Sequence, residues 1–164
     1  DGMRSYEAVS AGGPLTAVVF ARHCVDSMSG MPHPRTVEVR WQGRVLKGCG
    51  GDPAELLQGG AWEVVEIDGR AVADPTRVTV NFAPEGRLAG IAACNRYFGR
   101  YALSGEGLRL SPLGATKMAC EPGAMEEERR FMEAAGRVDA FVIAADGSVQ
   151  LRAGGRVTMR ARRP

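Results

Sequence analysis

The segment GIAACNRYFGRY, residues 90–101, contains the pattern on which the fold prediction depends. It leads from an apolar run into a cysteine, Cys94, and then mixes aromatic residues with arginine and glycine. Aromatic rings and arginines in this order could stack on a ligand or on single-stranded nucleic acid. A strand that packs its rings inward, with the arginine stems along the surface, is the more common arrangement. Burial and exposure of the rings both stay open at this point.

The residues around this segment alternate between apolar and polar types, which is typical of antiparallel strands with one wet face. Val78, Val80 and Phe82, for example, are separated by Thr79 and Asn81. Turn signals that contain glycine separate such runs from one another. We therefore expect about eight strands here, which begin near Trp62, Val78, Arg87, Gly99, Gly107, Ala140, Ser148 and Val157.

One helix is expected between the fifth and the sixth of these strands. It begins at residues 122–123, Pro-Gly, and Gly136 is a natural stop. Apolar residues recur within it at helical spacing, Met125 and Phe131 among them, and such a stripe usually packs on a sheet. A short helical turn is expected at residues 53–57. The predicted fold class is therefore mostly β with one packed helix.

Glycine and proline crowd together at residues 48–53, which predicts a boundary between two modules. We expect a small N-terminal β-module at residues 1–52 and a larger domain at residues 53–164. The first piece holds about three predicted strands, which is too little for an independent core unless a disulfide or packing against another domain stabilises the piece.

The four cysteines allow three pairings. Cys24 and Cys49 are almost as far apart in sequence as Cys94 and Cys120, which fits one disulfide in each module. On the chain-entropy account, a loop of that size stabilises the fold by about 3–4 kcal/mol. Four buried thiols in a reducing compartment remain the alternative.

Other chemistry is less well supported by the residues. His23 and His33 could complete a zinc site with two of the cysteines, but no C-x-x-C or H-x-x-x-H spacing occurs. Cys94 would need a base to act as a nucleophile, and residues 53–164 contain no histidine. We expect no catalytic residue, no metal site and no cofactor.

The net charge gives no support for nucleic acid as a partner. The formal net charge of the 164-residue chain is only +2, which does not favour nucleic acid binding. No apolar run is long enough for a membrane-spanning helix. Arginines near the end of the chain predict a basic strand face, which would suit anionic lipid or would protect a solvated edge strand. These arginines are Arg152, Arg156, Arg160, Arg162 and Arg163.

A family resemblance emerges from these motifs. Residues 90–101 resemble the signature G-x-x-G-C-N-R-[YF]-x-G-x-Y of the META domain, the HslJ-like family. Residues 115–120, ATKMAC, resemble its T-x-M-A-C motif, and Glu128 with Phe131 resembles its E-x-x-F segment. Trp62 lies where that family has its opening tryptophan.

The order and spacing agree over residues 55–164, with one departure at Ala93, where the family usually has glycine. The resemblance implies an antiparallel β-barrel or strongly curved sheet with one packed helix. It also implies that Cys94 and Cys120 are paired. The motif residues carried over, with structural or binding roles, are Asn95, Arg96, Tyr97, Gly99, Tyr101, Thr116 and Met118.

The N-terminal piece resembles the end of a bacterial envelope-lipoprotein module that often precedes META domains. The similar residues are the segment at 24–30, CVDSMSG, then Pro34, then the hairpin that ends at residues 46–49, LKGC. This second resemblance implies that Cys24 pairs with Cys49.

The resemblances imply a non-catalytic protein of the periplasm or outer cell envelope. We expect an accessory binding role in envelope stress or antibiotic tolerance, with an envelope protein or peptide as partner. The alternative is a protein-partner module such as a lysozyme inhibitor or a secretin-pilot-like lipoprotein. We expect a monomer, and a targeting segment, with or without a lipid anchor, removed ahead of Asp1.

Overall fold

The computed structural model describes residues 2–164, and the chain forms two compact units. The first unit ends at Leu56 and the second begins at Leu57. No helix among the described residues is both long and apolar enough to cross a membrane.

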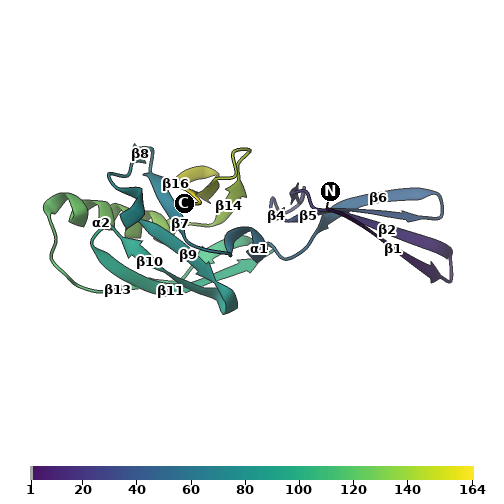
Figure 1. The fold of residues 1–164 in the computed structure, drawn as a ribbon, viewed down its shortest axis with the longest axis horizontal. Helices are drawn as coiled ribbons and strands as arrows, with labels where there is room; N and C mark the ends of the chain where they lie inside the picture. Colours follow the sequence, from purple (N-terminus) through teal and green to yellow (C-terminus); the bar gives the residue numbers. More distant parts are fainter. Residues whose placement is uncertain (1) are drawn as a thin grey trace. The chain divides into compact units, whose positions relative to one another are not determined.

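The first unit is a four-stranded antiparallel sheet with the order β1-β2-β5-β6 (Figure 1). Its strands are β1 (Met3–Ser10), β2 (Gly13–Phe20), β5 (Arg35–Trp41) and β6 (Arg44–Gly50). A separate two-stranded ladder joins β3 (Cys24–Val25) to β4 (Pro32–His33). The prediction of about three strands was too low, because exposed β1 has little apolar alternation to reveal it.

The loop that carries β3 and β4 is tied to the sheet by the disulfide between Cys24 and Cys49, whose Cα atoms lie 5.3 Å apart. Met31, within this loop, is buried. The Asp26 carboxylate caps the turn by accepting from the backbone N–H groups of Met28 and Ser29. The hydrogen bonds from Ser29 are the largest cause that holds the pKa of Asp26 below its usual value.

The second unit is a nearly closed antiparallel sheet with the order β12-β11-β10-β9-β7-β16-β15-β14, which confirms the predicted fold class. The Leu108 N–H donates to the Asp139 carbonyl over 3.0 Å and links the sheet's two ends. The eight strands are β7 (Trp62–Ile67), β9 (Thr79–Ala83), β10 (Arg87–Ala92), β11 (Asn95–Ser104), β12 (Gly107–Leu110), β14 (Ala140–Ile143), β15 (Val149–Ala153) and β16 (Arg156–Arg162). Two short strands, β8 (Arg70–Ala71) and β13 (Gly114–Ala115), pair with β7 and β11.

Helix α2 (Pro122–Arg137) packs on this sheet, as its apolar stripe predicts. The Phe131 ring lies 5.0 Å from the Tyr97 ring, centroid to centroid, and both side chains are fully buried. The buried stripe is narrower than expected, because Met125 is 39% exposed. A single turn, α1 (Ala54–Leu57), precedes β7, and 3₁₀ turns occur at Pro75–Arg77 and Pro84–Gly86.

Strand β16 corrects one expectation, since it lies between β7 and β15 and is not an edge strand. The β15–β16 ladder shifts register where Leu151 faces Met159 and Arg152 faces Val157, so Thr158 has no partner residue and forms a β-bulge. The Thr158 side chain is buried. The last arginine, Arg163, leaves the strand face altogether. Its guanidinium stacks on the Trp62 ring at 3.9 Å and donates to the carbonyls of residues 57, 58 and 60.

The turn between β10 and β11 holds a non-glycine residue with left-handed backbone. Ala93 has φ +60°, and its N–H donates to the Arg77 carbonyl over 2.8 Å. An alanine in this region costs about 1–2 kcal/mol relative to right-handed backbone. Ala93 is therefore strained at the position where glycine is usual in the resembling family.

We predict that Ala93→Gly raises the free energy of unfolding by about 1 kcal/mol, because glycine removes this strain. Ala92→Gly is the matched control: Ala92 is fully buried in β10, so the same change there lowers stability by about 1 kcal/mol. Urea unfolding measures both. Equal destabilisation by the two variants would show that Ala93 is held by packing and carries no strain.

Candidate binding groove

Strand β11 begins at Asn95, earlier than the predicted start near Gly99, so the whole aromatic motif lies within one strand. Tyr97 and Tyr101 point into the barrel and are buried, whereas Phe98 is 63% exposed. Alternation along the strand therefore sends the tyrosines into the core and leaves Arg96 and Phe98 on the surface.

The two tyrosines are anchored by their hydroxyl groups. Tyr97 Oη donates to the Thr79 carbonyl over 2.7 Å, and burial raises the pKa of Tyr97 far above its usual value. Tyr101 Oη donates to the Ala83 carbonyl and accepts from Gln58 Nε2. Both hydroxyl groups thus hold neighbouring backbone in place.

Two glycines allow the close contacts in this region. A Cβ at Gly90 would lie 2.0 Å from the Thr79 carbonyl oxygen, and a Cβ at Gly99 would lie 2.7 Å from the Leu113 side chain. The resembling family's glycines at these positions are therefore explained by backbone approach and by packing against the loop that follows β12.

Asn95 is 1% exposed and joins three parts of the chain through its side chain. Its Oδ1 accepts from the Met118 N–H over 2.7 Å and from the Thr116 hydroxyl over 2.9 Å. Its Nδ2 donates to the Met118 carbonyl and to the Glu128 carboxylate. Its backbone N–H also donates to Glu128 over 2.8 Å. The turn, the loop before α2 and α2 itself meet at this one side chain.

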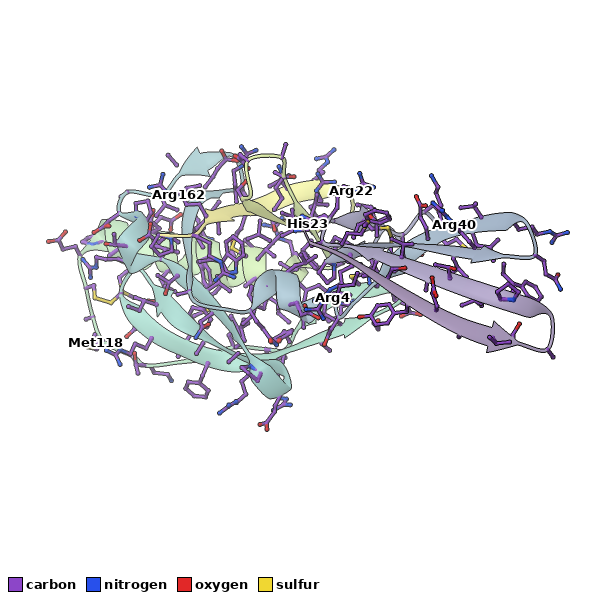
Figure 2. All side chains as sticks on the ribbon, turned by 45° about the vertical axis from the view of Figure 1, so that its right-hand side comes forward. Arg4, Arg22, His23, Arg40, Met118 and Arg162 are labelled. Atoms are coloured by element: carbon purple, nitrogen blue, oxygen red, sulfur yellow. A yellow bond between two sulfur atoms is a disulfide. The ribbon has the colours of Figure 1, made fainter. Side chains whose placement is uncertain are left out.

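Thr116 extends the network to β11. Its Oγ1 accepts from the Arg96 N–H over 3.2 Å, and its own N–H donates to the Arg96 carbonyl over 3.0 Å. Met118 contributes only backbone groups, because its side chain is 59% exposed and lies at the periphery of the unit (Figure 2). The structure therefore gives Asn95 and Thr116 well-defined hydrogen-bonding roles within the fold.

A disulfide between Cys94 and Cys120 fastens the same turn to the start of α2, with the Cα atoms 5.9 Å apart. A cysteine in a disulfide cannot act as a thiolate nucleophile. The two disulfides of the chain are consistent with a protein exported to an oxidising compartment.

The histidines do not meet the cysteines as a metal site would require. Cys24 and Cys49 are bonded to each other, and His33 Nδ1 donates to the Gly51 carbonyl over 3.0 Å. Among residues 2–164, no group of three or more histidine, cysteine, aspartate or glutamate side chains is placed to hold a metal ion.

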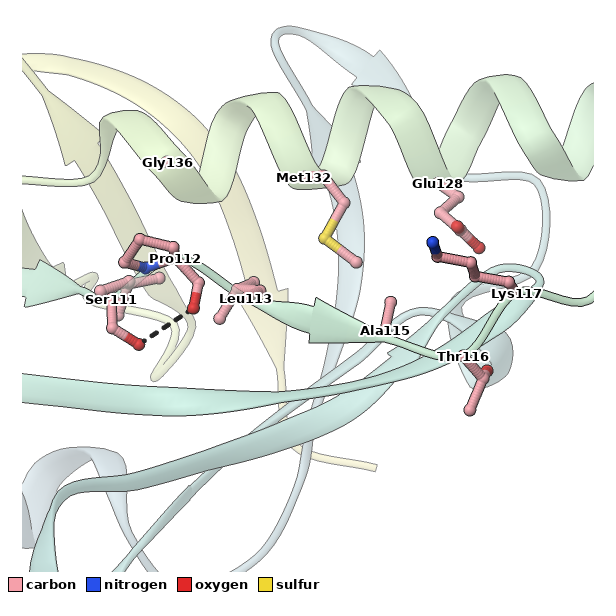
Figure 3. Close-up of a pocket in the computed structure, with 10 residues that line it drawn as sticks. Ser111, Pro112, Leu113, Ala115, Thr116, Lys117, Glu128, Met132 and Gly136 are labelled. Atoms are coloured by element: carbon pink, nitrogen blue, oxygen red, sulfur yellow. Dashed lines mark hydrogen bonds between the residues drawn. The ribbon is translucent and has the colours of Figure 1, made fainter.

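A groove of about 740 Å³ lies between α2 and the loop that links β12 to the end of β13 (Figure 3). Met132 points from the helix toward Leu113, and Lys117 lies beside Glu128 at one end. Apolar groups line most of the groove, with these two opposite charges at the end. Its lining residues are Leu110, Ser111, Pro112, Leu113, Ala115, Thr116, Lys117, Glu128, Met132 and Gly136.

One strand edge with free backbone groups borders this groove. Residue pairs exchange backbone hydrogen bonds at every second position of an antiparallel ladder. The Thr116 N–H donates to the Arg96 carbonyl at one such position, so Ala115, which faces Tyr97, turns its N–H and carbonyl away from β11. This orientation offers one donor and one acceptor to an extended segment laid in the groove.

Sequence reasoning found Asn95, Thr116 and Glu128 through the motifs but did not find the groove. Residues 111–113 have no periodic pattern, and the apolar residues of the helix, to which Met132 belongs, were expected only to pack on the sheet. The free edge at Ala115 depends on its pairing with β11, a contact distant in sequence that local patterns do not contain.

These features define a small, disulfide-containing domain with a barrel-like antiparallel sheet and one packed helix. The model of the META domain family matches residues 55–164, about two thirds of the chain, and the chain belongs to that family. The resemblance stated from the motifs is confirmed for this part of the chain.

Two solved structures share the fold. A protein from Burkholderia xenovorans, determined by NMR, is 27% identical with a TM-score of 0.52; the match covers 71% of this chain and 93% of that one. A second NMR structure is 21% identical with a TM-score of 0.51, and the match covers 66% of this chain and 92% of that one. The comparison with curated proteins found no match.

We predict that Thr116→Val lowers the free energy of unfolding by about 1–2 kcal/mol, because the isosteric change leaves Asn95 Oδ1 and the Arg96 N–H with fewer partners. Thr76→Val is the matched control, since the Thr76 hydroxyl bonds only to exposed Asp74. Its expected cost is about 0.5 kcal/mol or less. Denaturant unfolding distinguishes the two, and equal costs would contradict a structural role for the Thr116 hydroxyl.

Proposed function

We propose that this protein is a non-catalytic binding protein of the cell envelope. In this proposal, its META domain holds an extended segment of a protein partner in the groove beside α2. The observation that carries the proposal is the free strand edge at Ala115, which borders a groove of about 740 Å³. That volume lies within the usual range for binding pockets.

The motif's polar groups support binding over catalysis. A general acid or base must reach the substrate with a group that is free to exchange a proton. The Glu128 carboxylate accepts from Asn95, and the Tyr97 hydroxyl donates to Thr79 within the core. Cys94 is bonded to Cys120. These groups are occupied in holding the fold together.

The groove suits an extended peptide more than a compact ligand. Adding a strand to a free edge supplies backbone hydrogen bonds, while pockets for alternate side chains supply selectivity. Here the edge is Ala115, apolar contacts come from Leu113 and Met132, and Lys117 would orient a negatively charged side chain.

The envelope location rests on the two disulfides, which persist in oxidising compartments. The family resemblance supports an accessory role in envelope stress or antibiotic tolerance, exercised through the bound partner.

The test selects a displayed library of random peptides on the wild-type protein and measures Kd for the enriched peptides by calorimetry. We predict that Ala115→Pro weakens their binding about tenfold or more, because proline removes the free N–H. The fold should tolerate this change, since that N–H makes no ladder bond to β11 and proline is accepted at strand edges.

Ala115→Ser is the matched control, because it keeps the backbone N–H and should retain most of the affinity. Met132→Trp, which fills the groove from the helix side, should abolish binding. Enriched peptides that bind all three variants as tightly as the wild type would contradict the groove as the site. A turnover activity lost in Glu128→Gln, with folding intact, would contradict the non-catalytic part.

A further inference from the structure

The outer face of strands β10, β11 and β12 carries four arginines and no acidic side chain. Arg87 lies on β10, Arg96 and Arg100 lie on β11, and Arg109 lies on β12; all four are exposed. We call this surface the basic face. It lies on the opposite side of β11 from the buried tyrosines.

The strand registers bring these residues together. Arg87 faces Arg100, and Ile91 faces Arg96 across the β10–β11 ladder. Residues that alternate with them point inward, and Leu88, Tyr97 and Leu108 among them are buried, so the basic face is a continuous outer surface. Its remaining members are Ala89 opposite Phe98, and Ala102 opposite Arg109.

These arginines lack carboxylate partners. Among the described residues, the guanidinium groups of Arg96 and Arg109 make no hydrogen bond or ion pair, and that of Arg100 donates only to the Glu85 main-chain carbonyl. The acidic residues nearest in sequence, Glu85 and Glu106, lie in the turns at one end of these strands.

The other half of the sheet is built differently. There Arg160 faces Glu66 and Arg162 faces Glu63 across the β16–β7 ladder. The Arg162 and Glu63 side chains approach to 4.0 Å. Two arginines of that half therefore face carboxylates, whereas none of the four on the basic face does, which favours a partner that supplies negative charge to the basic face.

An exposed aromatic ring lies in the middle of the basic face. Phe98 is 63% exposed and stands between Arg96 and Arg100 on the same strand. Its ring lies over Gly114, where an added Cβ would be 2.8 Å from it. An aromatic ring among arginines suits a boundary where apolar matter meets a layer of negative charge.

A shallow hollow of about 340 Å³ is lined by Asn81, Ala89, Gly90, Ile91, Arg96 and Tyr97. Ala89 faces Phe98 across the β10–β11 ladder. Asn81 and Arg96 bring an amide and a guanidinium, both hydrogen-bond donors, to its rim. A guanidinium binds phosphate oxygens through paired N–H groups. The hollow therefore offers a place for one phosphate-bearing headgroup.

We propose that the basic face binds the surface of an anionic phospholipid bilayer, with Phe98 entering the interfacial layer and the arginines contacting headgroup phosphates. The outer side of a curved sheet is convex, so it meets a flat layer of charge more readily than it encloses a flexible polymer. This surface is separate from the groove, and the two proposals can fail independently.

The test is sedimentation of the full chain with vesicles of phosphatidylcholine alone or mixed with phosphatidylglycerol. We expect binding to the mixed vesicles only, weakened by added salt. Arg96→Gln with Arg109→Gln should reduce partitioning about 25-fold, since each surface arginine contributes about fivefold. Phe98→Ala should reduce partitioning about fivefold.

The matched control is Arg70→Gln with Arg156→Gln, which removes the same charge from exposed sites on β8 and β16 and should leave partitioning nearly unchanged. Thermal unfolding verifies that every variant is folded. Equal loss in the control variant, or binding to neutral vesicles, would overturn the proposal. So would arginine-dependent binding to single-stranded DNA or polyaspartate without vesicle binding, which would assign the face to an acidic polymer.

Discussion

The structure of the META domain depends on one buried side-chain amide. Asn95 satisfies donors and acceptors from the loop at Thr116 and Met118 and from Glu128 on α2. In a low-dielectric interior such a network is strong when complete, and an unpaired member is costly. Asn95 therefore holds three segments distant in sequence in a fixed arrangement, and we call their meeting point the junction. The disulfide from Cys94 to Cys120 links the same segments.

Both proposed surfaces follow from this junction. It sets the direction in which β11 leaves the turn, and alternation along the strand then buries Tyr97 and exposes Arg96 and Phe98. It also holds the loop that ends at Thr116 against β11, which leaves Ala115 as a free edge beside the helix. A change at Asn95 should therefore affect the groove and the basic face through the fold, without contact with either ligand.

Local sequence patterns predicted the strands and the helix of this domain because alternation and helical spacing are properties of short segments. They did not predict the interior position of β16 or the stacking of Arg163 on Trp62, which depend on pairing between distant strands. The motifs identified Asn95, Thr116 and Glu128 but not the hydrogen bonds between them. The groove was missed because residues 111–113 fold against the sheet through contacts that no periodicity encodes.

The most direct test of the junction is a double-mutant cycle on Asn95→Ala and Glu128→Ala, with the free energies of unfolding measured in urea. The backbone N–H of Asn95 keeps its bond to Glu128 in the first variant, so the cycle reports the side-chain contact. We predict a coupling free energy of about 2 kcal/mol, within the range for partners in one network. Additive costs, with coupling below about 0.5 kcal/mol, would contradict the central role of Asn95.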